Sequence, residues 1–388
     1  MEALTFDVAV IGAGPAGSAA AALLARRGFS VALVDRDEFP RDKLCGEFLS
    51  YDALPVLDAL GATAAIDAAG APSIRTCRIV GSRRTHEFDF PHAARGVSRM
   101  FFDDLLLRTA TAAGATSFTG WTATDLTRSE IALARDGESR TLRAGVVIGA
   151  WGRWGRFDAQ LQRTFVRDRS HRNFGFKRHY VRLEGAPDDA IELYSFGRGY
   201  LGVSAVEGGV TNICGLVHAS RLSGHKGRWD SFVDSIRVEE RRLDSMYSRY
   251  APAQEQFLSS EPVIFRPRSP VERGVLMIGD ASGIIDPLTG NGMAMAIQSA
   301  LVAAPYVERL LTTADRAEIE RDYRAAHAAM FSARIAWSRR AAWVLARPRL
   351  LDAMLATVRS ERLAPFLLAR TRADRDAVAR LTESWISC

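Results

Sequence analysis

The chain has 388 residues, of which 47% are hydrophobic and 31 are glycine, so it can bury a sizeable core and should be globular throughout. Its formal net charge is +6, carried almost entirely by arginine, without the basic clusters interleaved with aromatic residues that nucleic-acid binding requires. The four cysteines include no C-x-x-C pair and the seven histidines have no metal-ligand spacing, which indicates a reducing compartment and no metal site.

The first predicted elements are a strand, a tight turn and a helix. An apolar run over residues 6–11 leads into the pattern G-x-G-x-x-G, and a helix of small residues is expected over 16–27. Gly12 permits the tight turn, Gly14 lets the backbone approach a pyrophosphate, and Gly17 lets the helix pack on the strand. The N-terminus of the helix would supply oriented N–H groups to the anion.

A second apolar run, over residues 31–34, ends in Asp35, whose carboxylate would accept hydrogen bonds from an adenosine ribose. Further along the chain, residues 75–90 alternate as a hairpin does, and residues 174–268 contain several strand-like runs. We expect these runs to form a sheet that lies over the cofactor and walls the substrate cavity.

Another buried strand is predicted far downstream, over residues 274–278. It runs into a turn that carries Asp280, and a helix rich in Ala and Met begins near Met293. A domain that binds NAD does not need a second nucleotide-facing strand end so far along the chain, whereas an extended FAD does. The two motifs together therefore favour FAD.

From about residue 294 onward the pattern is helical, with Pro348 and Pro365 expected to break it into pieces. Residues 333–372 mix aromatic residues with many arginines, which allows either a helical cap on the protein's own domain or contact with an anionic membrane surface. No uncharged apolar run approaches the ~20 residues of a membrane helix, and Asp7 interrupts the only apolar stretch that could serve as a leader. These features predict a cytoplasmic protein.

These motifs resemble the flavoprotein superfamily that contains para-hydroxybenzoate-hydroxylase-type monooxygenases, flavin-dependent halogenases and geranylgeranyl reductases. The resemblance implies FAD, with Asp280 on a ribityl hydroxyl and the following turn and helix N-terminus against the pyrimidine end of the flavin. The residues expected to contact the cofactor are Gly12, Gly14, Ala16, Gly17, Asp35, Arg36, Cys45, Gly46, Arg99, Ala123, Gly279, Asp280, Pro287, Gly290, Asn291, Gly292 and Met293.

Residues 39–50 resemble the P-x-x-K-x-C-G-G segment that runs under the flavin in the geranylgeranyl reductase branch, and Arg99 opens the R-x-x-F-D-x-x-L pattern of that branch. The second glycine of the segment is Glu47 here. The Y-x-W-x-F-P motif of the reductases is incomplete at Tyr200, which argues against a long polyprenyl substrate. The W-x-W-x-I-P motif and catalytic lysine of the halogenases are missing, so halogenation is not expected.

A second departure concerns the electron donor. The hydroxylases carry a D-G pair after their third core strand, and here Trp151 stands in place of the acid. That acid helps to hold pyrophosphate and the nicotinamide cofactor in the hydroxylases. The source of electrons is therefore left open between NADPH acting directly and a partner, either a flavin reductase or a ferredoxin-type donor.

The resemblance implies an α/β fold: a Rossmann-like FAD-binding domain of the GR2 type, an inserted antiparallel β-sheet substrate domain and a C-terminal helical region. The FAD-binding domain is expected over residues 1–74, 96–164 and 271–310. The substrate domain is expected over 75–95 and 165–270, and the helical cap over 311–388.

The favoured reaction is monooxygenation of an aromatic or polyketide-like small metabolite through a flavin C4a-hydroperoxide. The first alternative is an ene-reductase that reduces C=C bonds, and a further alternative is a flavin-binding partner protein without turnover. Cys45 and Glu47 border the flavin in the resemblance, and His179 lies on an alternating strand that faces it, so these three are the candidate catalytic residues.

Overall fold

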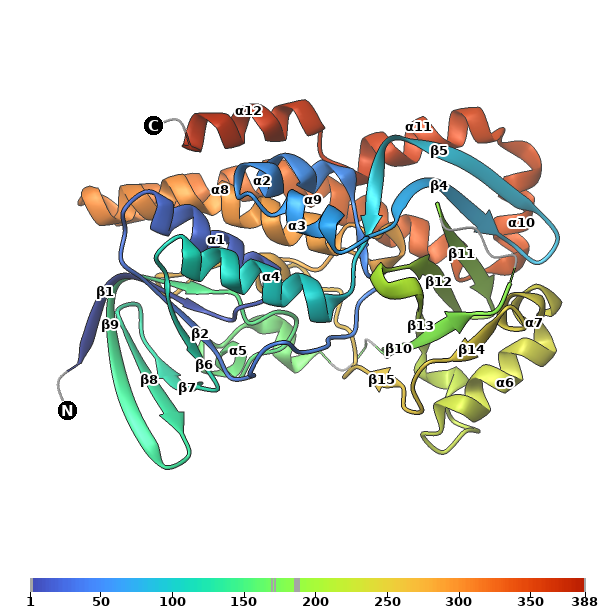
Figure 1. The fold of residues 1–388 in the computed structure, drawn as a ribbon, viewed down its shortest axis with the longest axis horizontal. Helices are drawn as coiled ribbons and strands as arrows, with labels where there is room; N and C mark the ends of the chain where they lie inside the picture. The colour runs from blue at the N-terminus through green and yellow to red at the C-terminus, as the bar shows by residue number, and fades with distance from the viewer. Residues whose placement is uncertain (1–2, 169, 171, 185–188, 387–388) are drawn as a thin grey trace.

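The computed structural model describes residues 3–168, 170, 172–184 and 189–386, and it places them around two β-sheets joined by helices (Figure 1). The expected fold is confirmed: a mostly parallel sheet with the nucleotide motif, a largely antiparallel second sheet and a helical C-terminal region. The nucleotide motif and the second sheet meet in the middle of the molecule, where the candidate site lies.

The first sheet has the strand order β16-β17-β9-β1-β2-β6, and its core strands β17, β9, β1, β2 and β6 run parallel. The strands β7 and β8 form an antiparallel extension on β9. The bounds are β1 Leu4–Ile11, β2 Val31–Asp35, β6 Thr116–Thr119, β7 Thr122–Leu126, β8 Glu130–Arg135, β9 Glu138–Gly149, β16 Val271–Glu272 and β17 Val275–Met277.

The core strands of this sheet are buried on both faces, as expected for parallel strands. Val8 and Val10 face the cluster that includes α1, α4 and α8, whereas Ala9 and Ile11 face the cluster formed with β7, β8 and α5. The helices are α1 Pro15–Arg26, α2 Leu54–Ala59, α3 Thr63–Ala68, α4 Arg99–Ala112, α5 Phe157–Gln160 and α8 Gly292–Thr312.

The second sheet has the strand order β14-β10-β13-β12-β11-β4-β5-β3, with β15 added on β10, and β11 and β4 form its one parallel pair among the described residues. The strand-like runs predicted within residues 174–268 fall in it. The bounds are β3 Phe48–Leu49, β4 Ser73–Val80, β5 Thr85–Gly96, β10 Asn173–Arg182, β11 Ala190–Phe196, β12 Gly199–Ala205, β13 Val210–His218, β14 Tyr250–Pro252 and β15 Leu258–Ser259.

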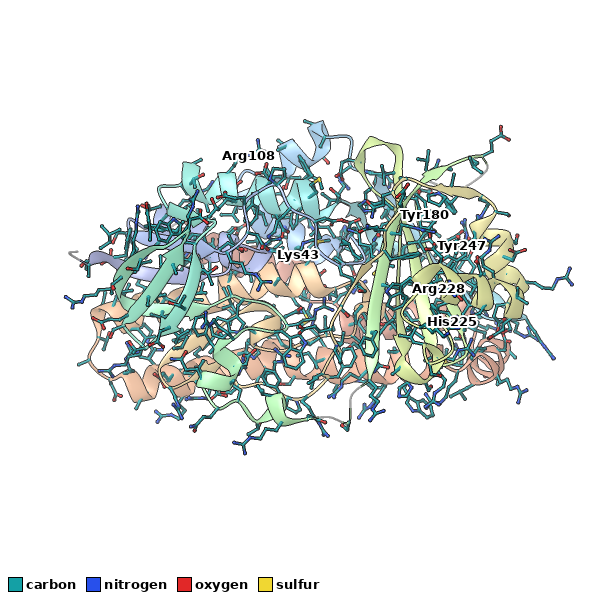
Figure 2. All side chains as sticks on the ribbon, turned by 90° about the horizontal axis from the view of Figure 1, so that it is seen from below. Lys43, Arg108, Tyr180, His225, Arg228 and Tyr247 are labelled. Atoms are coloured by element: carbon teal, nitrogen blue, oxygen red, sulfur yellow. The ribbon has the colours of Figure 1, made fainter. Side chains whose placement is uncertain are left out.

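Helices cover the outer face of the second sheet. The pair α6 (Trp229–Glu239) and α7 (Arg241–Tyr247) packs there, with the Tyr180 and Tyr247 rings 5.9 Å apart. Figure 2 labels both tyrosines on this side, and it labels Lys43 in the middle of the molecule between the two sheets. The inner face of the second sheet is shared between the site and the C-terminal helices.

The C-terminal helices are α9 Arg316–Leu345, α10 Pro348–Thr357, α11 Ser360–Thr371 and α12 Arg375–Ile386. Pro348 starts α10 as expected, but the expectation for Pro365 was wrong, because α11 continues through it. Leu345, Leu351, Leu355 and Leu363 bury the apolar faces of α9, α10 and α11 against the second sheet. Among the described residues no helix is long and apolar enough to cross a membrane.

Candidate active site

A cavity of about 510 Å³ runs from the nucleotide motif of the first sheet to the inner face of the second sheet. Fifteen of the residues expected to contact the cofactor line its wall, although they come from six separate stretches of the chain. They are Gly12, Gly14, Ala16, Asp35, Arg36, Cys45, Gly46, Arg99, Ala123, Gly279, Asp280, Pro287, Gly290, Gly292 and Met293.

At the nucleotide end of the cavity the acid of the second strand is held in place by the turn before α1. The Asp35 Oδ2 atom accepts a hydrogen bond from the Ala13 N–H at 2.7 Å, and Oδ1 accepts one from the Asp37 N–H at 3.0 Å. A carboxylate has about four lone-pair sites, so Asp35 retains the capacity to accept hydrogen bonds from a ribose. Its position therefore suits the role that the sequence predicted.

The glycines of the cavity wall leave open the space that a bound FAD would need. A Cβ atom added to Gly14 would meet nothing nearer than Arg99 Nη2 at 3.8 Å, and one added to Gly46 or Gly292 would meet nothing within 4 Å. Gly14 is also the N-cap of α1, whose first N–H groups are unpaired and can bind an anion. The residues present thus fit the pyrophosphate and the ring of FAD.

A network of ion pairs surrounds this end of the cavity, and one member of it was missed by the sequence reasoning. Arg99 and Arg41 both bind the buried Asp103, at 2.6 Å each, and Arg41 also reaches Asp35 at 3.3 Å. Burial lowers the pKa of Arg99, but the Asp103 charge outweighs it and the net shift is upward. Asp103 is the acid of the R-x-x-F-D pattern, one helical turn after Arg99, whereas nothing in the sequence marked Arg41.

Two of the expected cofactor residues lie outside the cavity wall. Gly17 packs against the Gly12 carbonyl oxygen, which an added Cβ would approach to 1.8 Å, in line with its expected role in packing the helix on the strand. The Asn291 side chain is fully buried and donates a hydrogen bond to the Thr371 carbonyl oxygen. That side chain therefore fastens α11 to the start of α8, and the cofactor contact expected for Asn291 stays a prediction.

Glu47 and His179 also lie outside the wall, whereas Cys45 lines it. The Glu47 side chain is fully buried, and its carboxylate binds Lys177 at 2.7 Å and His179 at 2.6 Å. The structure thus brings Glu47 and His179 together but turns them away from the cavity. An acid–base role on a substrate is not supported by this placement, and a positioning role fits it better.

The second sheet supplies a separate part of the cavity, which we call the substrate chamber. Alternate residues of three neighbouring strands form one wall, and a loop after η5 (Gly279–Ala281) packs against them. The chamber residues are Ile191, Leu193, Tyr200, Gly202, Cys214, Leu216, Ile284, Ile285 and Leu288. Among them, Tyr200 is the only one whose side chain carries an oxygen.

The Tyr200 hydroxyl is paired with a buried carboxylate. It donates a hydrogen bond to Asp286 Oδ1 and accepts one from the Leu288 N–H at 3.0 Å. Burial raises the pKa of Asp286 to about 6, although the hydrogen bonds from Tyr200 and Leu288 oppose the shift. Burial and the Asp286 charge also raise the pKa of Tyr200. The chamber wall thus holds a hydroxyl group bound to a buried carboxyl group whose pKa is raised, and the sequence reasoning missed this pair.

Trp151, which stands in place of the hydroxylase acid, lines the cavity. Its indole Nε1–H donates to Asp158 Oδ1 at 3.2 Å, and the buried Arg163 binds the same oxygen at 2.9 Å. The Asp158 carboxylate therefore lies behind the Trp151 indole, and the indole, which forms part of the cavity wall, separates this carboxylate from the cavity.

Curated relatives span several reactions. A tryptophan 2-halogenase from Chondromyces crocatus is 28% identical over 325 residues, which are 78% of this chain and 61% of the halogenase, so the chain spans less than two thirds of that protein. A menaquinone reductase from Mycolicibacterium smegmatis is 29% identical over 322 residues, or 77% of this chain and 75% of the reductase.

Solved structures share the fold of this chain over most of its length. The flavin-dependent brominase Bmp2 superposes with a TM-score of 0.78 at 19% identity, covering 99% of this chain and 98% of the brominase. PqsL from Pseudomonas aeruginosa, described as a probable FAD-dependent monooxygenase, superposes with a TM-score of 0.72 at 18% identity, covering 91% and 100%. At these identities the likeness establishes the fold and leaves the reaction open.

The sequence pattern of one family covers most of the chain. The FAD binding domain family matches residues 5–332, which include the nucleotide motif, the Asp280 turn and the second sheet. The chain therefore belongs to the FAD binding domain family of flavoproteins.

Proposed function

We propose that this protein is an FAD-dependent monooxygenase for a compact aromatic or polyketide-like metabolite that carries a hydroxyl group. The observation that carries the proposal is the Tyr200–Asp286 pair, which is set in a chamber whose other side chains are apolar or lack oxygen. An apolar wall suits a planar ring, and a single polar pair fixes the orientation of one substituent.

The size of the cavity supports a compact substrate. Sites for small ligands range from about 300 to 1,000 Å³, and the cavity of about 510 Å³ must hold the flavin as well as the substrate. We infer that a cavity of this size, shared with the flavin, suits one or two rings better than a long isoprenoid chain.

When bound, FAD would supply the redox chemistry with oxygen, and the chain would supply orientation and proton transfer. Tyr200 accepts a hydrogen bond from the substrate hydroxyl, because its own proton points to Asp286. As electron density leaves the ring, the substrate O–H bond breaks and its proton passes to the Tyr200 oxygen. The original Tyr200 proton passes to Asp286, which ends protonated, as its raised pKa allows.

The positions of the lysines do not favour halogenation. Lys43 lies at the cavity wall but binds Asp37 at 2.6 Å, Lys177 is fully buried in the Glu47 cluster, and Lys226 is exposed on a turn. These are the three lysines of the sequence, and none belongs to the substrate chamber. A lysine that could act on a halogen species is therefore missing from that place.

A second candidate function is reduction of a C=C bond. It is favoured by the same carboxyl group: near pH 6 a part of Asp286 is protonated, and Tyr200 can then donate a proton into the chamber as Asp286 replaces it. The menaquinone reductase among the relatives is in line with this alternative.

A single-turnover experiment separates the two functions. The FAD-loaded protein is reduced with dithionite under nitrogen, freed of excess reductant and mixed with a panel of phenols, anthranilates and hydroxynaphthoquinones, with and without labelled dioxygen. Monooxygenation places one label in the product and requires oxygen. A product that is formed without oxygen and contains two additional hydrogens would assign the protein to the reductases instead.

A further inference from the structure

The segment of residues 42–47 crosses the inner face of the second sheet and contributes Lys43, Leu44, Cys45 and Gly46 to the cavity wall. At its end, Glu47 has a φ of 55°, a left-handed conformation that glycine adopts easily and a glutamate rarely. The reductase branch has glycine at this position. A glutamate that is retained in such a conformation, and is fully buried, needs strong compensating contacts.

Those contacts come from two elements of the fold. Glu47 Oε1 accepts hydrogen bonds from Lys177 Nζ at 2.7 Å and from the Arg99 N–H at 2.8 Å, and Oε2 lies 2.6 Å from His179 Nε2. Both carboxylate oxygens are therefore engaged, and the partners belong to β10 and to the start of α4. The Arg99 side chain that follows this N–H lines the cavity near Gly14.

Lys177 holds both ends of the segment. Its ammonium group is fully buried and binds Asp42 at 2.7 Å as well as Glu47. Burial lowers the pKa of Lys177, but the charges of Glu47 and Asp42 outweigh it, so the pKa rises and the group stays charged. Between these ends, the Asn212 side chain donates to the Cys45 carbonyl oxygen at 2.9 Å. The segment is thus tied to the sheet at its start, middle and end.

We propose that Lys177 is a positioning residue, which acts through Glu47 to fix the shape of the segment 42–47 beside the flavin. In this chain the ion pair between Lys177 and Glu47 holds residue 47 in the left-handed conformation that a glycine would adopt easily. The Glu47 carboxylate also binds the Arg99 N–H at the start of α4 and thereby fixes the position of Arg99. The inference applies equally to an oxygenase and to a reductase, so it does not stand or fall with the reaction proposed above.

The test compares Lys177→Met, Glu47→Gly and the double variant, purified as full-length proteins with FAD. Lys177→Met leaves the buried Glu47 carboxylate without its cation, so we expect FAD affinity to fall at least about tenfold. We also expect iodoacetamide to label Cys45 several times faster, as measured by peptide mapping. In the double variant a glycine meets the left-handed turn and the buried Glu47 carboxylate is gone, while the Asp42 carboxylate, 18% exposed, can be solvated by water. Both values should therefore return to within about threefold of those of Glu47→Gly.

Lys226→Met, at an exposed lysine that also has a positive φ of 49°, is the matched control and should leave both values unchanged. Wild-type FAD affinity and Cys45 labelling in Lys177→Met would overturn the proposal. So would a double variant as impaired as Lys177→Met, since Lys177 would then act independently of Glu47. If Lys177→Met does not fold, a folded double variant supports the proposal, and a double variant that also fails while Glu47→Gly folds refutes it.

Discussion

Tyr200 of β12 and Asp286 of the loop before η6 (Pro287–Thr289) share a hydrogen bond across 86 residues of sequence, and the Leu288 N–H donates to both, at 3.0 Å and 3.1 Å. The Asp286 N–H is in turn bound by the Ser338 hydroxyl oxygen at 3.1 Å. The pair is thus fixed from the sheet, from the turn expected to border the flavin, and from α9. A group held from three sides can orient a substrate without a large reorganisation.

Replacing Tyr200 with Phe should lower the single-turnover rate by about 100-fold, because general acid–base groups contribute about 10² to 10⁴. FAD content should stay at one per chain. Tyr194→Phe is the matched control: it removes a buried hydroxyl that binds Glu192 at 2.8 Å and does not line the cavity. Equal losses in the two variants, measured by stopped flow, would contradict a specific role for Tyr200.

The raised pKa of Asp286 predicts that its contribution to the free energy of unfolding falls as the pH rises. Its pKa is raised from 3.8 to about 6, so the folded protein binds a proton more tightly than the unfolded chain does. The resulting stabilisation is complete only well below pH 3.8 and is lost as the pH rises through 6, a total of about 3 kcal/mol.

Urea unfolding at saturating FAD, compared between wild type and Asp286→Asn from pH 4 to 7.5, measures this effect. The free energy of unfolding of the wild type should fall relative to that of the variant by about 2 kcal/mol over this range, because the unfolded carboxyl is already partly ionised at pH 4. A constant difference between the two proteins would show that Asp286 titrates normally.

Gly14 and Gly12 should respond differently to a side chain. Gly14→Val adds atoms to open space, so the protein should fold with a loss of about 1 kcal/mol at the N-cap but without FAD. Gly12→Val meets the Ala150 carbonyl oxygen at 2.4 Å and requires a φ of 109°, so it should fail to fold stably. Circular dichroism and the flavin absorbance of the purified proteins separate the two cases, and a yellow Gly14→Val protein would contradict the assignment of the pyrophosphate site.

Trp151 predicts slow reduction by NADPH alone, because its indole lines the cavity where the hydroxylases have an acid. A flavin reductase or a ferredoxin system should reduce the protein faster. Anaerobic stopped-flow measurements of flavin bleaching test this, with dithionite as the control for a reducible flavin. Rapid and saturable bleaching by NADPH alone would show that the indole does not prevent direct reduction.

The nucleotide half of the site could be predicted from the sequence because its function depends on local backbone geometry. The turn at Gly12, the open space at Gly14 and the carboxylate at the end of β2 follow from a few residues whose spacing is fixed by the strand and helix themselves. The strands of the second sheet could also be predicted, because the alternation of apolar and polar residues with a period of two is typical of a strand.

The tertiary structure alone decided which polar side chains meet. Glu47 was expected beside the flavin, yet it turns toward Lys177, which lies 130 residues away, and the Asn291 side chain turns toward Thr371, which lies 80 residues away. Buried polar groups must find partners, and those partners come from whatever element packs across them. No local sequence pattern shows which elements pack together. The Tyr200–Asp286 pair could therefore be recognised only in the tertiary structure, where β12 lies beside the loop before η6.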